Sequence, residues 1–300
     1  MDMTRIGVVG AGRVGAVLAA AWRAAGHEIT MVAGESDASL RRARRLLPGV
    51  PVDKPTAVAR SCDLLVLAVP DDMLENVVTT LSDAGAIRPA QYVVHTSGRH
   101  GLRVLEPATV LGARPIALHP AMTFTGTEVD LGRVPGCVFG VTTSAPDTLA
   151  LAESLVTDLK GRIAHVAEEQ RALYHAGLAH GANHLVTLVS QAMEILREAG
   201  SDDPGALLRP LLAAALDNTL ESGDTALTGP IVRGDVETVR THLQEIRRAA
   251  PEALEAYVAL GRSTANRARM DGRLTAIRAA ELIGVLNEAA AESGIRRTEA

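Results

Sequence analysis

The sequence predicts a doubly wound α/β domain over residues 1–166, followed by an all-helical domain over residues 167–300. Up to about residue 166, short apolar runs alternate with helical patterns, which is typical of a parallel sheet covered by helices on both faces. Beyond that point the strand signals stop and long helical patterns follow. The chain has 300 residues, 47% of them hydrophobic, which is enough for two cores of ordinary size.

The first domain contains eight short apolar runs that we interpret as strands. Turn signals such as Pro48-Gly49 and Pro70-Asp71 separate them. The runs span residues 6–9, 28–32, 50–52, 64–69, 92–95, 115–119, 138–142 and 163–166.

The second domain is expected to consist of long helices with recognisable ends. Asp203 places a capping carboxylate before an N1 proline, and Asp235 is suited to cap a later helix. A helical block of this size often dimerises, so we expect a homodimer through this domain. The predicted helices span residues 168–199, 204–221, 235–249, 251–269 and 273–292.

The most specific local motif is GAGRVG, which follows the first apolar run and opens an alanine-rich helical pattern. In such a loop the first glycine allows a tight turn, the second lets the backbone approach a pyrophosphate, and the third lets the helix pack against the strand. The context of strand, glycine loop and helix therefore predicts a Rossmann domain that binds a dinucleotide. The expected contacts are Gly10, Gly12, Arg13, Val14 and Gly15.

The choice between NAD and NADP depends on Gly34, Glu35 and Ser36, which follow the second apolar run. Glu35 lies 20 residues after Gly15, where an acidic residue normally binds the ribose 2′-OH of NAD. Ser36 and the arginines within residues 41–45 equally suit the 2′-phosphate of NADP. The sequence leaves NAD and NADP close to even.

Other candidate site residues directly follow later strands, because ligands of doubly wound sheets bind at the carboxyl ends of the strands. We expect Val69 and Pro70 to lie along the nicotinamide ribose, and Thr96 and Ser97 to bind a substrate. His119 ends the next run. A histidine has an ordinary pKa near 6.5 and both gives and takes protons at neutral pH, so His119 is a catalytic candidate.

Two features of the helical domain are further candidates. His180, Asn183 and His184 share one polar face of the first long helix. His180 and His184 have a spacing that suits a metal, but no third ligand is evident, and we predict no metal site. In the segment ALTGPIVRGD, a loop shaped by glycine and proline presents Arg233, which suits either a substrate carboxylate or an interdomain ion pair.

Composition argues against several other classes of function. A net charge of −5 and 2% aromatic residues do not favour a nucleic-acid surface. Neither a targeting signal nor a membrane segment is recognisable, and Cys62 and Cys137 belong to apolar runs, which does not favour disulfides. A cytoplasmic setting is therefore expected.

Taken together, these motifs resemble a bacterial family of Rossmann-like proteins with a 6-phosphogluconate-dehydrogenase-like C-terminal domain. Some members are alternative-type ketopantoate reductases, which make pantoate with NADPH. The resemblance implies reduction of a small branched 2-oxo acid, and ketopantoate is the best specific candidate. Prephenate dehydrogenases carry a similar His-Pro motif with a catalytic histidine, so a dehydrogenase of that kind is the alternative. The resemblance covers residues 5–290 through GAGRVG, LAVPDD, HTSG, LHPAMTF, YHAG and LTGPIVRGD.

The sequence departs from the better-known relatives at the first long helix, where they carry a lysine shortly before an asparagine. Asn183 is present, but no lysine follows Lys160. His180 stands at about the lysine's place, so either His119 or His180 is the expected proton donor, with Asn183 and Ser97 positioning the carbonyl. The missing lysine also favours a rival hypothesis, a dinucleotide sensor or scaffold without turnover. Glu35, where arginine is more usual, puts an NADP preference in doubt.

Overall fold

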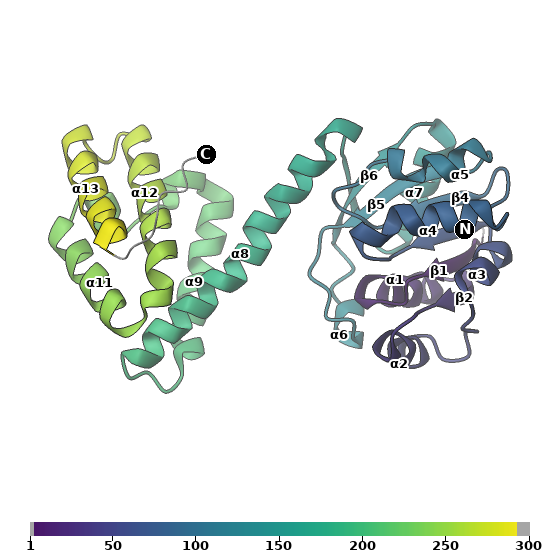
Figure 1. The fold of residues 1–300 in the computed structure, drawn as a ribbon, viewed down its shortest axis with the longest axis horizontal. Coiled ribbons are helices and arrows are strands. Elements are labelled where there is room, and N and C mark those ends of the chain that lie inside the picture. The colour runs from purple at the N-terminus through teal and green to yellow at the C-terminus, as the bar shows by residue number, and fades with distance from the viewer. Residues whose placement is uncertain (1–2, 293–300) are drawn as a thin grey trace. The chain divides into compact units, whose positions relative to one another are not determined.

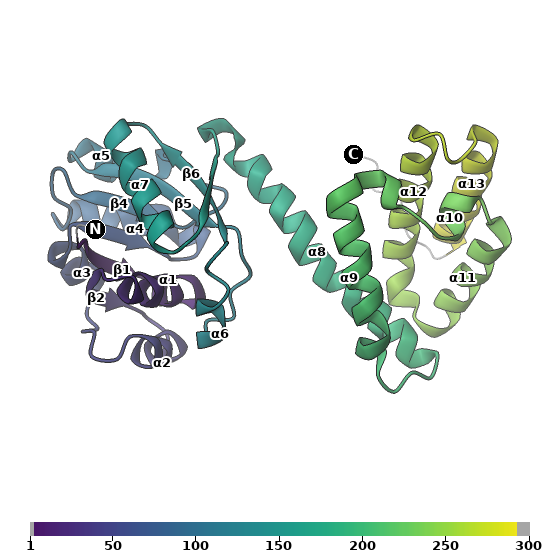
Figure 2. The same cartoon turned by 180° about the vertical axis from the view of Figure 1, so that it is seen from behind.

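The computed structural model describes residues 3–292, which divide into two compact units on either side of the bond between Ala182 and Asn183. Figures 1 and 2 show the two units from opposite sides. Their boundary falls inside helix α8 (Arg171–Glu198). The beginning of this helix therefore belongs with the sheet of the first unit.

A seven-stranded sheet in the order β2-β1-β3-β4-β5-β6-β7 forms the centre of the first unit. Seven of the eight expected strands are present. The eighth, over residues 50–52, is reduced to one bridge between Val52 and Val32. The strands are β1 (Arg5–Val9), β2 (Glu28–Ala33), β3 (Leu64–Leu67), β4 (Tyr92–His95), β5 (Arg114–Pro120), β6 (Val138–Thr143) and β7 (Arg162–His165).

The sheet is mostly parallel, as expected for a doubly wound domain, and β6 is the exception. This strand runs antiparallel to β5, with His119 opposite Gly140. The connection over residues 121–137 contains only the four-residue helix α6 (Glu128–Leu131). A parallel crossover needs a dozen or more residues that traverse the length of the sheet. Here the connection instead packs beside α1 through α6, and β6 enters the sheet at the end where β5 leaves it.

Helices cover both faces of the sheet, as predicted for a doubly wound domain. Along β3, Leu64 and Val66 belong to one buried cluster and Leu65 and Leu67 to the other, as the two-residue period of a strand requires. One cluster includes α1 (Arg13–Ala24), α2 (Asp37–Leu46) and α7 (Pro146–Asp158). The other includes α3 (Pro55–Ser61), α4 (Asp71–Asp83) and α5 (Glu106–Val110).

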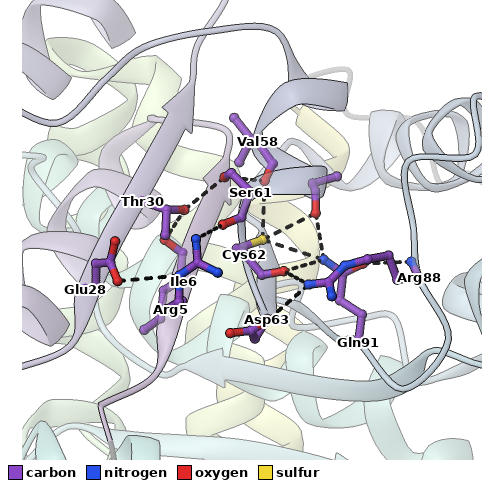
Figure 3. A network of polar contacts seen from close by, with 11 residues as sticks. Arg5, Ile6, Glu28, Thr30, Val58, Ser61, Cys62, Asp63, Arg88 and Gln91 are labelled. Carbon is purple, nitrogen blue, oxygen red and sulfur yellow. Dashed lines mark hydrogen bonds and ion pairs between the residues drawn. The ribbon is translucent and has the colours of Figure 1, made fainter.

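The amino-terminal edge of the sheet is held by a polar network (Figure 3). The buried Gln91 amide donates to the carbonyl oxygens of Ala59 and Cys62 at 2.7 and 2.9 Å. Arg88 donates to the same Cys62 carbonyl at 2.6 Å and pairs with Asp63 at 3.0 Å. The network ties the loops before β3 and β4 together at the end of the sheet opposite the strands' carboxyl ends.

The second unit is helical, and the predicted helices are confirmed to within a few residues. Asp203 and Asp235 cap their helices as expected, accepting from Ala206 N–H at 2.9 Å and Thr238 N–H at 3.1 Å. A buried cluster joins the last three helices. The helices are the later part of α8, then α9 (Pro204–Ser222), α10 (Pro230–Arg233), α11 (Val236–Ala249), α12 (Leu254–Met270) and α13 (Ala276–Glu292).

Candidate functional site

The glycine loop has the three local constraints that its sequence predicts. Gly10 has φ +99°, and a Cβ there would collide with the backbone of Ala68. A Cβ on Gly15 would collide with the carbonyl oxygen of Gly10 and come within 2.8 Å of the Ala68 side chain. A Cβ on Gly12 would meet nothing closer than 4.0 Å. The first and third glycines are therefore required by packing, whereas the second keeps an open approach to the N-terminus of α1.

A cavity of about 740 Å³ adjoins this loop. It lies at the carboxyl ends of β1 and β3, where the chain's direction of winding reverses and where doubly wound sheets bind ligands. Asp53 and Lys54 also line the cavity, and the sequence reasoning missed them although they directly follow the run over residues 50–52 that it interpreted as a strand. Predicted cofactor residues that line the cavity are Gly10, Gly12, Gly34, Glu35, Ser36, Val69 and Pro70, while Arg13, Val14 and Gly15 continue into α1.

The residues proposed to distinguish NAD from NADP lie at one end of this cavity. Glu35 is exposed along its wall, and Ser36 caps α2 by accepting from Ser39 N–H at 3.1 Å. Two of the arginines on α2 have other partners. Arg42 donates to the Ala11 carbonyl at 3.4 Å, and Arg45 pairs with Glu128.

A second cluster of chemically active side chains lies at the end of β5. His119 Nδ1 is 3.0 Å from the hydroxyl oxygen of Tyr174, and the two rings meet edge to face. The ring of His175 also meets His119 edge to face, with centroids 5.8 Å apart. Gly98 makes room for both histidines, because a Cβ there would come within 3.0 Å of His119 Nε2 and would collide with His175. Two strand ends and the first turn of α8 thus converge on His119.

Arg171 places a buried positive charge beside this cluster. The residue is 1% exposed, and its guanidinium donates to the carbonyl oxygens of Ser97, His100 and Gly140 at 2.5 to 3.0 Å. Its central carbon lies 5.7 Å from the centre of the Tyr174 ring. Burial, followed by the charge of Arg171, lowers the pKa of His119 to about 4. His119 is therefore a neutral imidazole at pH 7.

His95, at the end of β4, supports the loop that follows it. Its Nδ1 accepts from Ser97 N–H at 3.2 Å, and Nε2 bonds the carbonyl oxygen of Gly101 at 2.8 Å. Burial lowers the pKa of His95 to about 4. Ser97 is buried, with its hydroxyl oxygen accepting from His100 N–H at 3.2 Å, and Thr96 is half-buried beside it. The predicted substrate residues Thr96 and Ser97 thus lie in a loop whose shape is held by His95 and Arg171.

The remaining predicted residues lie farther along the chain. His180 and Asn183 are exposed on α8, on either side of the boundary between the units. At 1.5 Å per residue, Asn183 is about 13 Å along the helix from Tyr174. Arg233 is exposed at the end of α10, in the second unit, where Gly229 and Gly234 adopt positive φ.

Sequence reasoning missed Tyr174, His175 and Arg171. A usable signal was present, because the segment RALYHAG begins a helix with one arginine, one tyrosine and one histidine within five residues. Helical projection shows which of these share a face but does not show which face meets the sheet.

A glycine loop at the switch point of a doubly wound sheet, followed by a helical unit, defines a Rossmann-like protein with a helical C-terminal domain. Two family models agree with this definition. A Rossmann-like domain matches residues 2–120, and a domain of unknown function, DUF2520, matches residues 137–264. Together, the two matches fit a family that joins a Rossmann-like domain to a helical C-terminal domain. No curated protein sequence matches it.

Solved structures share the fold at low sequence identity. A Bacteroides fragilis protein described as a candidate NADP oxidoreductase is 22% identical with a TM-score of 0.76, covering 87% of this chain and 98% of its own. The Plasmodium falciparum pyrroline carboxylate reductase with NADP bound is 12% identical with a TM-score of 0.57, covering 95% and 99%. An Aspergillus terreus reductive aminase in complex with NADPH and ethyl-5-oxohexanoate is 18% identical with a TM-score of 0.59, covering 97% and 95%.

Two further findings for the described residues concern membrane-spanning helices and clusters of metal-binding side chains. Over residues 3–292, no helix combines the length and apolar character needed to cross a membrane. The same residues contain no group of three or more histidine, cysteine, aspartate or glutamate side chains arranged to hold a metal ion.

Proposed function

We propose that this protein is an oxidoreductase that binds NAD or NADP in the cavity beside the glycine loop. The observation that carries this proposal is the contrast between Gly12, which faces open space, and Gly10 and Gly15, which are packed against protein atoms. The N-terminus of α1, whose N-cap Gly12 makes no side-chain hydrogen bond, then suits a pyrophosphate. The similar fold of proteins solved with NADP or NADPH supports the same cofactor class.

Gly12→Val tests the cavity directly. The new side chain meets no protein atom within 4.0 Å at its Cβ, so the variant should fold, but it occupies the pyrophosphate approach. We expect fluorescence titrations with NADH and NADPH to show at least about a tenfold weaker Kd, a loss of about 1.4 kcal/mol. The matched control is Gly284→Val on α13, where a Cβ also meets open space. Unchanged binding by a folded Gly12→Val variant would place the dinucleotide elsewhere.

We propose further that the substrate is a small oxo or hydroxy acid, with ketopantoate, reduced to pantoate, as the best specific candidate. The proposal rests on the motif resemblance and on His119, a neutral imidazole at the end of β5. In this hypothesis His119 or His180 protonates the carbonyl oxygen and Ser97 positions it.

A panel of oxo acids, hydroxy acids and cyclic imines, assayed with both nicotinamides, tests the reaction. We expect ketopantoate to give the highest kcat/KM. Turnover of prephenate alone would favour the alternative dehydrogenase. Binding of both dinucleotides without turnover of any compound would instead favour the sensor hypothesis, for which the absence of lysine after Lys160 is the supporting observation.

We also propose that the protein forms a homodimer through α9. This helix has 19 residues, and Pro204 is its only buried residue. An isolated helix of that length is marginally stable in water, and exposed leucines along it favour a covering partner. Leu207, Leu211, Leu216 and Leu220 are 50 to 78% exposed.

Light scattering coupled to size exclusion tests this assembly. The natural protein should elute as a dimer at micromolar concentration and Leu211→Glu as a monomer. The control is Ile277→Glu on α13, which changes a side chain that is 82% exposed outside α9. A monomeric natural protein, or a dimeric Leu211→Glu variant, would contradict the proposal.

A further inference from the structure

His119 and Tyr174 have the geometry of a pair that exchanges a proton. The hydroxyl oxygen of Tyr174 lies 3.0 Å from Nδ1, and the ring centroids are 5.6 Å apart at an interplanar angle of 88°. The other ring nitrogen, Nε2, lies over Gly98, which has no side chain to cover it. Each nitrogen of His119 therefore has a different neighbour, a phenol at Nδ1 and a glycine backbone at Nε2.

Glycine at position 140 is needed for this pair to form. A Cβ there would come within 2.5 Å of the Tyr174 hydroxyl oxygen. Gly140 lies opposite His119 in the antiparallel pairing of β5 and β6. The reversed strand thus places a small residue where the tyrosine must approach.

Arg171 supplies a positive charge next to the phenol. The hydrogen-bond partners of its guanidinium are carbonyl oxygens and the Thr142 hydroxyl. None of these partners is a carboxylate that would neutralise its charge. An opposite charge nearby favours the ionised form of a tyrosine. Arg171 therefore opposes the effect of burial, which raises the pKa of Tyr174.

We propose that His119 and Tyr174 form a proton relay for the reduction proposed above, with Arg171 as the residue that stabilises the resulting tyrosinate. This inference rests on the proposed function. Nε2–H gives its proton to the substrate's carbonyl oxygen while Nδ1 takes the proton of the Tyr174 hydroxyl. A bound reduced nicotinamide would supply the hydride to the carbonyl carbon, so the alcohol would gain one hydride and one proton. Water restores the missing proton after the product leaves.

The relay requires a neutral His119 that carries its proton on Nε2. The charged and titratable groups facing this imidazole are Arg171, His175, Tyr174 and Asp71. Arg171 and His175 disfavour the protonated, positively charged form of His119. Asp71 favours that form, but its effect is smaller, because the pKa of His119 still lies at about 4. A neutral imidazole has one N–H, and a phenol donating to Nδ1 leaves that N–H at Nε2.

Nitrogen-15 NMR of the full-length protein at pH 7 tests the tautomer without any turnover. We expect the His119 signals of a neutral ring with Nε2 protonated and Nδ1 unprotonated, assigned by their loss in His119→Gln. A ring with Nδ1 protonated would donate to Tyr174 and would overturn the relay. Because no substrate is needed, this result is independent of the proposed reaction.

Tyr174→Phe tests the relay in the reaction. The ring remains, so dinucleotide binding should be unchanged, while kcat should fall about 10- to 100-fold because the proton donor to Nδ1 is lost. Rates measured across mixtures of H₂O and D₂O should show two transferred protons in the natural protein and one in the variant. Natural kcat and an unchanged two-proton dependence in Tyr174→Phe would overturn the relay.

A matched control is Tyr257→Phe in the helical unit. Tyr257 makes a similar bond, with its hydroxyl oxygen 2.9 Å from His242 Nδ1. This variant should retain natural kcat and the two-proton dependence. If the natural protein reduces no compound of the panel, the proposed function fails, whereas the NMR tautomer still decides the state of the His119–Tyr174 pair.

Discussion

The carbonyl oxygen of Gly10 occupies the space that a side chain on Gly15 would need. This contact joins the first and third glycines of the loop and brings α1 close to the strand that precedes it. The same two glycines also pack against Ala68 in the segment after β3, because a Cβ on either glycine would come within 2.8 Å of an Ala68 atom. The loop's shape therefore depends on backbone packing between two strand ends.

Gly15→Ala is expected to destabilise the fold by about 1–3 kcal/mol, because the added methyl group overpacks a backbone contact. Urea denaturation followed by circular dichroism measures the loss. Gly12→Ala should cost less than about 1 kcal/mol, because it only replaces a glycine at a helix N-cap. Equal stability of the two variants would contradict the packing role of Gly15.

Glu35→Gln is expected to improve NADPH binding relative to NADH by about five- to tenfold. The carboxylate lies on the cavity wall and repels a 2′-phosphate, whereas the amide does not. The ratio of the two Kd values from fluorescence titration is the measurement. Glu75→Gln, an exposed carboxylate on α4, is the control. An unchanged ratio in Glu35→Gln would mean that its side chain faces away from the bound ribose.

His119→Ala is expected to slow hydride transfer by roughly 100- to 10,000-fold, the usual contribution of a positioned acid. Single-turnover measurements of nicotinamide absorbance report this step. The same replacement at His180 tests the alternative donor. A loss of less than a few-fold at His119, together with a large loss at His180, would reverse the assignment.

Stability is expected to fall between pH 6.5 and about 4 through His95. Burial lowers its pKa from 6.5 to about 4, so the unfolded chain binds a proton in this range before the folded one does. The buried ring therefore costs on the order of 3 kcal/mol once both states are protonated. Urea denaturation at several pH values, compared with His95→Gln, isolates the effect. Parallel pH profiles for the two proteins would contradict it.

Gln91→Leu is expected to destabilise the first unit by roughly 2–4 kcal/mol, because buried carbonyl oxygens lose their donor. Thermal and urea unfolding measure this loss. Arg5→Ala removes an exposed ion pair to Glu28 in the same network, and it should cost less than about 1 kcal/mol. A loss from Arg5→Ala as large as that from Gln91→Leu would show that exposed charges hold this edge.

Local sequence signals predicted most of the fold. The strands β1 to β7 and the helices of the second unit follow from periods of 2 and 3.6 residues, with turn and capping residues at their ends. The strand prediction for residues 50–52 was wrong. Two valines around a proline have the composition of a strand, but no neighbouring strand pairs with this segment along its length.

The sequence by itself determined the glycine loop, the order of the elements and the histidine at the end of β5, because each depends on residues close together in the chain. Only the tertiary structure decided that β6 runs antiparallel and that Tyr174 reaches His119, 55 residues away. Gly140 and Gly98 leave room for these rings, and Arg171 at the start of α8 places a positive charge beside them. Such contacts depend on which faces pack together, and a periodic pattern shows that a face is buried without showing against what.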